Sequence, residues 1–275
     1  REGDVVSALD LEKLEALGIQ QASHDTLDIA SAVLLAIILV LTLGWYTAHS
    51  QTKTLADYRR WLFLIAGILL FTFVGRLGAS DRIVEGVSWG YLVPFAVLPM
   101  LVGMLLDQQL AVVIAILVGI LYGYSSGRSL DACAMVMLGG IVGALVTRQI
   151  ERLSAFLWAG VFVALTNLAV VFVFVVPSRQ LDTNSLLAAG ILALINGGLA
   201  AAITAITFSP LGNALGATTV LHLLDLAHPS QPLFRRLLLE APGTYHHSVI
   251  IGTLAERAAE RIGAEHNLVR VAAYY

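Results

Sequence analysis

The stretch IASAVLLAIILVLTLGWYTA, residues 29–48, contains no charged side chain and is almost wholly apolar. An α-helix needs about 20 mostly apolar residues to cross the hydrocarbon core of a bilayer. The stretch therefore predicts a membrane-spanning helix, and the rest of the chain repeats the pattern.

The composition of the whole chain is also typical of a membrane protein. Of its 275 residues, 58% are hydrophobic and 13% are charged, whereas about 25% of the residues of a soluble domain are charged. The formal net charge of −3 gives no overall attraction to nucleic acid. We therefore expect membrane lipid, and no nucleic acid, among the partners. With one cysteine, Cys133, the chain cannot form an intrachain disulfide.

Six further apolar stretches predict an all-α membrane protein built on a seven-helix transmembrane bundle. Stretch 132–147 is short and could be half of a re-entrant hairpin. For this stretch and for 110–127, the sequence leaves open whether the helix crosses the membrane completely. Pro210 and Gly212 should end the last span, because a proline inside a helix removes a hydrogen bond. The six stretches are 61–75 (extending past Arg76 to 79), 87–106, 110–127, 132–147, 153–178 and the first part of 183–224.

The basic residues between the spans indicate the orientation, because cytoplasmic loops carry an excess of lysine and arginine. With the amino end outside, the inner loops hold Lys53, Arg59, Arg60, Arg148 and Arg152, and the outer loops hold Arg76, Arg82, Arg128 and Arg179. Arg235 and Arg236 add to the inner side. We therefore expect an extracytoplasmic amino end and a cytoplasmic carboxyl end.

Two asparagines lie inside predicted spans, Asn167 and Asn196. Polar groups in a membrane either join helices by hydrogen bonds or mark a functional site. We interpret the pair mainly as packing residues and keep both as candidate intramembrane site residues. Pro94 and Pro99 should kink the third span or line a cavity. Small residues that let helices approach closely are Gly139, Gly140, Gly143, Gly197 and Gly198.

Two classes of membrane protein fit these spans poorly. Lysine is absent after Lys53, which excludes a retinal-type Schiff base on the last span and hence a light-driven pump. A transporter or channel would need paired ionisable residues near the bilayer midplane, and the spans offer two asparagines instead.

The segments outside the bundle are predicted to be helical. We assign residues 1–28 to the end of an extracytoplasmic domain, 29–210 to the bundle, 211–231 to a helical linker and 232–275 to the start of a further helical domain. In that last part the chain becomes amphipathic, with alternating apolar and charged helix faces.

Two adjacent histidines follow a turn predicted at Pro242 and Gly243, where a helix is expected to begin. Neutral imidazole is the commonest side-chain metal ligand. Successive residues of a helix point about 100° apart, so His246 and His247 should not both reach one metal. Taken alone, the pair does not distinguish a metal site from surface or capping residues.

Four segments within residues 228–275 resemble the start of the cytoplasmic HD domain in the seven-transmembrane HD family: HPSQPL, APGTYHHS, LAERAAERIGA and VRVAAYY. These are bacterial membrane phosphodiesterases of the cyclic di-AMP type. The stretch EGDVVSALDLEKLEALGI at 2–19 looks like the end of the family's extracytoplasmic domain. With the seven spans, the resemblance covers essentially the whole chain.

The resemblance implies the membrane and linker portion of a receptor-like, metal-dependent phosphodiesterase in a bacterial inner membrane. It implies that His247 binds a divalent metal, Mn or Fe, and that His246 lies beside the metal ligands or faces the substrate. The family's His-Asp pair would follow Tyr275, so we expect this chain alone to be inactive and to bind metal weakly at most. The resemblance also implies a signal ligand, which the sequence does not identify. Whether the protein forms a homodimer is left open.

Two alternatives remain. One is a non-enzymatic multispan receptor whose tail is a scaffold, and the other is a transporter with a helical cytoplasmic tail.

Overall fold

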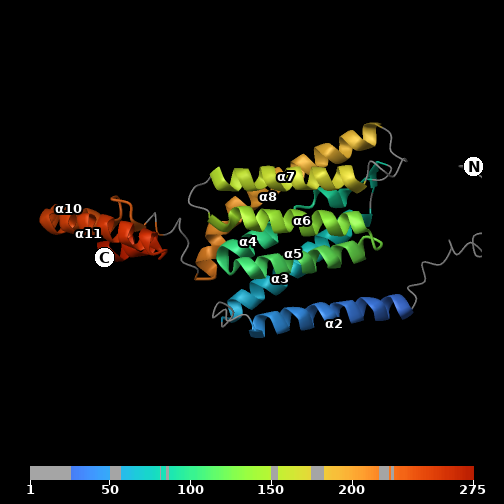
Figure 1. Cartoon of the computed structure of the whole chain (residues 1–275), viewed down its shortest axis with the longest axis horizontal. Coiled ribbons are helices and arrows are strands. Elements are labelled where there is room, and N and C mark those ends of the chain that lie inside the picture. Colours follow the sequence, from blue (N-terminus) through green and yellow to red (C-terminus); the bar gives the residue numbers. More distant parts are fainter. Residues whose placement is uncertain are drawn as a thin grey trace, which may run out of the picture. The chain divides into compact units, whose positions relative to one another are not determined.

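The structure, a computed structural model, describes residues 26–49, 57–80, 82–84, 87–149, 154–174, 183–216, 223 and 226–275. Within these residues the chain is helical except for one short hairpin (Figure 1), so the all-α expectation is confirmed apart from that hairpin. Residues 1–25, most of the segment assigned to an extracytoplasmic domain, lie outside the described residues. The elements are α2 (Thr26–His49), α3 (Tyr58–Ser80), β1 (Arg82–Val84), β2 (Val87–Ser88), η2 (Trp89–Leu92), α4 (Val97–Leu105), α5 (Gln108–Ser125), α6 (Leu130–Val146), η3 (Thr147–Gln149), α7 (Ser154–Phe174), α8 (Thr183–Ala214), α10 (Pro232–Glu240), α11 (Pro242–Arg261) and α12 (His266–Tyr274).

Five helices among the described residues are long and apolar enough to cross a membrane. The span expected at 110–127 is one of them, as helix α5. The first span, α2, belongs to a separate compact unit, residues 1–51, and the other four belong to residues 52–275. The five are Ile29–His49, Tyr58–Gly78, Gln108–Ser125, Ser154–Phe174 and Leu187–Ala214.

The third and fifth predicted spans are shorter apolar helices, Trp89–Leu105 and Leu130–Val146. Helix α6 has 17 residues, which is about 26 Å of helix against about 30 Å of hydrocarbon. Helix α4 contacts α5, α6 and α8, and seven of its nine residues are buried. Irregular or short backbone is tolerated at membrane depth where protein surrounds it. Helix length therefore supports five crossings. The short α6 agrees with the short stretch expected at 132–147, whereas the helix in the stretch 87–106 is shorter than the span that we expected there.

A break at Pro94 explains why the third segment is short. The 3₁₀ turn η2 ends at Leu92 and α4 begins at Val97, and a proline lacks the N–H that a continuous helix would need. Pro99 lies in the first turn of α4, where a missing N–H costs little, and its ring packs against Gly140 of α6. Of the two prolines expected to kink this span or line a cavity, only Pro94 interrupts it.

Helices α4 and α5 form a tight antiparallel pair, joined only by Leu106 and Asp107. The Asp107 carboxylate accepts a hydrogen bond from the backbone N–H of Leu110 at 2.9 Å, which caps the first turn of α5.

Helix α8 continues through Pro210 to Ala214, so the expectation that Pro210 and Gly212 end the span was wrong. The proline still removes one helical hydrogen bond. Phe208 and Leu215, on either side of it, are both buried in the main core of the bundle, and Leu211 packs against that core. This packing keeps the last turn of α8 folded beyond the proline.

Glycines bring α7 and α8 into backbone contact. A Cβ added to Gly160 would lie 2.7 Å from the Gly197 carbonyl oxygen, and one added to Gly197 would lie 2.6 Å from Ala164 Cβ. Gly198 faces open space. Close packing was expected at both glycines of the 197–198 pair, and the structure shows it at Gly197 alone. Gly143 of α6 also packs closely, because a Cβ there would lie 2.9 Å from Met100 Cγ.

Candidate functional site

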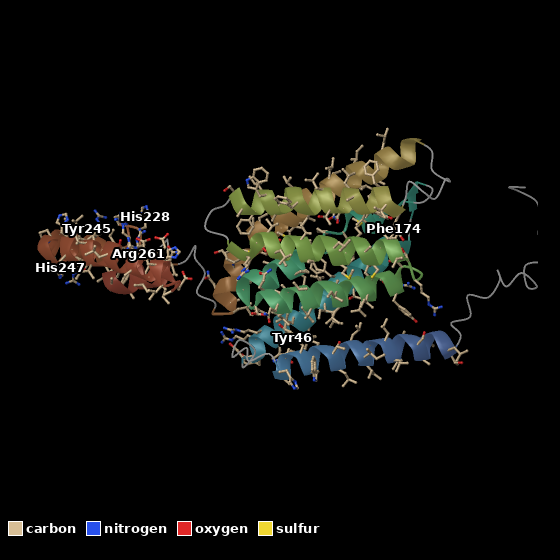
Figure 2. All side chains as sticks on the ribbon, in the orientation of Figure 1. Tyr46, Phe174, His228, Tyr245, His247 and Arg261 are labelled. Atoms are coloured by element: carbon tan, nitrogen blue, oxygen red, sulfur yellow. The ribbon has the colours of Figure 1, made fainter. Side chains whose placement is uncertain are left out.

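The two histidines lie on helix α11, one turn further into it than expected. Helix α11 begins at Pro242, which occupies its first position, and Gly243 is already helical. Proline is favoured at a first helical position because its N–H would be unpaired there anyway. The predicted turn is therefore the first turn of the helix. His246 and His247 are both exposed, and Figure 2 shows Tyr245 and His247 together along α11, with Arg261 at its other end.

An aromatic cluster positions this part of α11. Phe234 of α10 is 3% exposed, and three tyrosine rings meet it edge-on, with centroids at 5.9 Å for Tyr245, 5.1 Å for Tyr274 and 5.3 Å for Tyr275. The Tyr245 ring in turn contacts the His246 ring at 5.7 Å. Edge-to-face aromatic pairs stabilise beyond the area that they bury. The cluster joins α10, α11 and α12 and holds the histidine-bearing turn in place.

Polar contacts also join α11 to α12. Arg270 of α12 donates to Glu256 of α11 at 3.2 Å and to the Tyr274 hydroxyl at 3.1 Å. Burial acts to lower the pKa of Arg270, but the hydrogen bonds and charges of Tyr274 and Glu256 raise it overall. The guanidinium is thus held charged between the two helices.

The contact at Gly252 allows a test of this helix pair. A Cβ at Gly252 would lie 2.5 Å from Cε1 of Tyr274, so Gly252→Ala should push α12 away from α11 and cost about 1–3 kcal/mol. Gly243→Ala on the same helix meets open space and should cost nothing. Hydrogen–deuterium exchange of α12 peptides should be faster only in Gly252→Ala. Equal exchange in the two variants would show that Tyr274 does not hold the pair together.

The described residues bring together no group of three or more histidine, cysteine, aspartate or glutamate side chains. Sites for Mn or Fe use several such ligands. The described residues therefore place fewer than three potential metal ligands around His247. The His246 ring contacts the Tyr245 ring. His228, which the sequence placed in the HPSQPL segment, bonds with Nδ1 to the Ser230 hydroxyl at 2.7 Å.

The two intramembrane asparagines form a second polar site. Asn167 of α7 and Asn196 of α8 are each 2% exposed. Asn167 Nδ2 donates to Asn196 Oδ1 at 2.9 Å, the kind of interhelical hydrogen bond expected of a packing pair. Asn196 Nδ2 donates to the carbonyl oxygens of Tyr91 and Val93, at 3.0 and 2.8 Å. The pair thus joins two long helices to the break before α4.

Sequence reasoning missed a neighbouring polar contact. The Tyr91 hydroxyl donates to Asp131 Oδ2 at 2.7 Å, and the Ser129 hydroxyl donates to the other carboxylate oxygen. Ser129 also caps α6 by accepting from the Ala132 N–H at 3.2 Å. The serine directly before an apolar helix with Asp131 in its first turn was the available signal.

The family model described as "7TM receptor with intracellular HD hydrolase" matches residues 27–213. The chain is 28% identical over 286 residues to the cyclic-di-AMP phosphodiesterase PgpH of Bacillus subtilis (strain 168), covering 100% of the chain and 40% of that protein. It is 28% identical over 283 residues to PgpH of Listeria monocytogenes serotype 1/2a (strain 10403S), covering 100% of the chain and 39% of that protein.

A third relative, protein slr0104 of Synechocystis sp., is 29% identical over 201 residues, covering 72% of the chain and 20% of that protein. The chain thus spans about two fifths of the length of the two phosphodiesterases. No solved structure matches it.

Proposed function

The chain belongs to the family of 7TM receptors with an intracellular HD hydrolase, and from that premise we propose that it is the membrane and linker portion of a receptor-like cyclic-dinucleotide phosphodiesterase. The observation that carries the proposal is the similarity to two cyclic-di-AMP phosphodiesterases, which extends over the whole chain. We therefore propose cyclic di-AMP as the substrate of the full-length protein.

We further propose that a divalent metal, Mn or Fe, serves the reaction and that His247 is one of its ligands. When bound, such a metal activates water for attack on a phosphodiester. The exposure of His247 and the aromatic cluster behind it support this role, because the imidazole is free of core packing while its helix is held in place. His246, in contact with Tyr245, would lie beside the metal site or face the substrate.

The function is tested with full-length protein purified in lipid and supplied with Mn²⁺ or Fe²⁺. We expect the full-length protein to hydrolyse cyclic di-AMP. The 275-residue chain, assayed in the same way, should be inactive, because its described residues offer no group of three metal-ligating side chains. If the full-length protein hydrolyses no cyclic di-AMP with either metal, the proposed enzymatic activity is rejected and a non-enzymatic receptor is favoured.

For the membrane region we propose seven crossings of a bacterial inner membrane, with an extracytoplasmic amino end and a cytoplasmic carboxyl end. The five long helices support most of these crossings, and the two short ones complete the count. In this arrangement the residues after α8, which ends at Ala214, connect the bundle to cytoplasmic helices at 232–275. A signal from 1–28 or from the bundle passes along that connection.

Cysteine labelling tests this orientation. In a chain lacking Cys133, a membrane-impermeant thiol reagent added to intact cells should label Asp182→Cys and leave Asp57→Cys unlabelled. Asp57 directly precedes α3, in a loop that the proposal places inside the cell. Labelling at 57 with none at 182 would reverse the orientation and remove the enzyme proposal, because the substrate is cytosolic.

A further inference from the structure

A small cavity lies at the break before α4. Its volume, the space open to the centre of a water-sized sphere, is about 10 Å³, and it is lined by the unwound segment at Val93, Phe95 and Ala96, by α6 at Gly139 and Gly140, and by Asn167 and Asn196. Four parts of the bundle that are distant in the sequence therefore meet at one point.

The Asn167 side chain presents an open acceptor there. The Tyr91 and Val93 carbonyls can only accept, so they orient the Asn196 amide with Nδ2 toward them. Asn196 Oδ1 then faces Asn167 and accepts from its Nδ2. Asn167 Oδ1 is left buried with no hydrogen-bond partner among the residues that the structure describes. The amide orientation follows from its neighbours and does not depend on telling nitrogen from oxygen.

The backbone carbonyl of Phe95, another residue of the cavity lining, accepts no backbone hydrogen bond from the residues that the structure describes. Residue 99 is a proline, so it has no N–H to give to the carbonyl oxygen of Phe95, four residues earlier. Buried acceptors left without a donor lose the solvation that water gave them. The cavity thus combines two acceptors that the helices cannot satisfy.

We propose that the cavity is a binding site for one water molecule, which donates one hydrogen bond to Asn167 Oδ1 and the other to the unwound segment, at the Phe95 carbonyl. The ligand is a donor because the open groups are acceptors. It is neutral because no carboxylate lines the cavity. Buried waters bind where several polar groups lack partners and the space admits one molecule, and both conditions hold here.

Two glycines provide matched variants, Gly139 in the lining of the cavity and Gly198 outside it. A Cβ at Gly139 would lie 2.6 Å from Asn167 Oδ1, in the space where the water would donate. Gly198 of α8 does not line the cavity, and a Cβ there would meet nothing within 4 Å. Gly139→Ala should therefore expel the water, and Gly198→Ala should retain it.

The test is solid-state NMR of the chain in lipid vesicles, labelled with ¹³C-asparagine, with magnetisation transferred from water protons. We expect transfer to the Asn167 side-chain carbonyl carbon despite its burial, at an unchanged level in Gly198→Ala and at background in Gly139→Ala. Asn213, exposed near the end of α8, reports that the transfer works. Absence of transfer to Asn167 in the wild type, with transfer to Asn213, would overturn the proposal whether or not either variant folds. Undiminished transfer in folded Gly139→Ala would also overturn it.

Discussion

Replacing His247 with alanine in the full-length protein is expected to reduce hydrolysis of cyclic di-AMP on the order of 100-fold or more. Loss of a residue that only supports a metal ligand costs about 10- to 100-fold, so loss of a ligand should cost at least the upper value. The fold should survive, because His247 is exposed on α11 and alanine is the best helix former. The measurement is turnover at saturating metal, together with bound metal per protein and the thermal unfolding midpoint.

His246→Ala is the matched control, since the two residues are adjacent, exposed and on the same helix. It removes the ring contact with Tyr245 and should lower turnover less than His247→Ala. Equal turnover of wild type and His247→Ala at matched metal content would reject the ligand assignment. A larger loss in His246→Ala would move the ligand role to that residue.

Gly197→Ala is expected to destabilise the bundle by about 1–3 kcal/mol, the cost of overpacking a close contact. The new Cβ would lie 2.7 Å from the backbone nitrogen of Ala164 and would also meet the Gly160 carbonyl oxygen. Backbone atoms cannot rotate aside as a side chain does, so α7 and α8 would have to separate along their contact. Denaturant unfolding of the protein in detergent micelles measures the loss.

Gly198→Ala, one residue further along α8, is the control for helix propensity. Its Cβ meets nothing within 4 Å, and replacing glycine in a helix interior by alanine stabilises by about 0.5–1 kcal/mol. The two variants should therefore shift the unfolding midpoint in opposite directions. A common shift in both would show that the backbone contact between α7 and α8 is not limiting for stability.

The long helices were predictable from composition because lipid demands an apolar side chain at nearly every position. The helix through Pro210 was not, because burial of Phe208 and Leu215 overrides the local penalty of the proline. The hydrogen-bond partners of Asn196 could not be predicted from the sequence either. Tyr91 and Val93 lie 105 and 103 positions away in the chain, and no local pattern indicates which backbone groups a buried amide reaches.

For the candidate metal site, the sequence pointed to His247 through its neighbours and not through spacing. The structure adds that α11 starts at Pro242 and that Phe234 anchors the turn that carries the histidines. The anchoring aromatic residues come from three helices, and their meeting at Phe234 depends on tertiary packing that periodicity does not encode.

The break before α4 has a consequence for how the protein is made. A nine-residue helix is too short for the translocon to recognise as an autonomous span, because such recognition needs about 20 apolar residues. The next helix follows after only Leu106 and Asp107. We therefore expect α4 to partition into the membrane together with α5 as one helical hairpin during synthesis. The carbonyl groups of the unwound segment would then lack their hydrogen-bond donor until Asn196 is synthesised, about a hundred residues later.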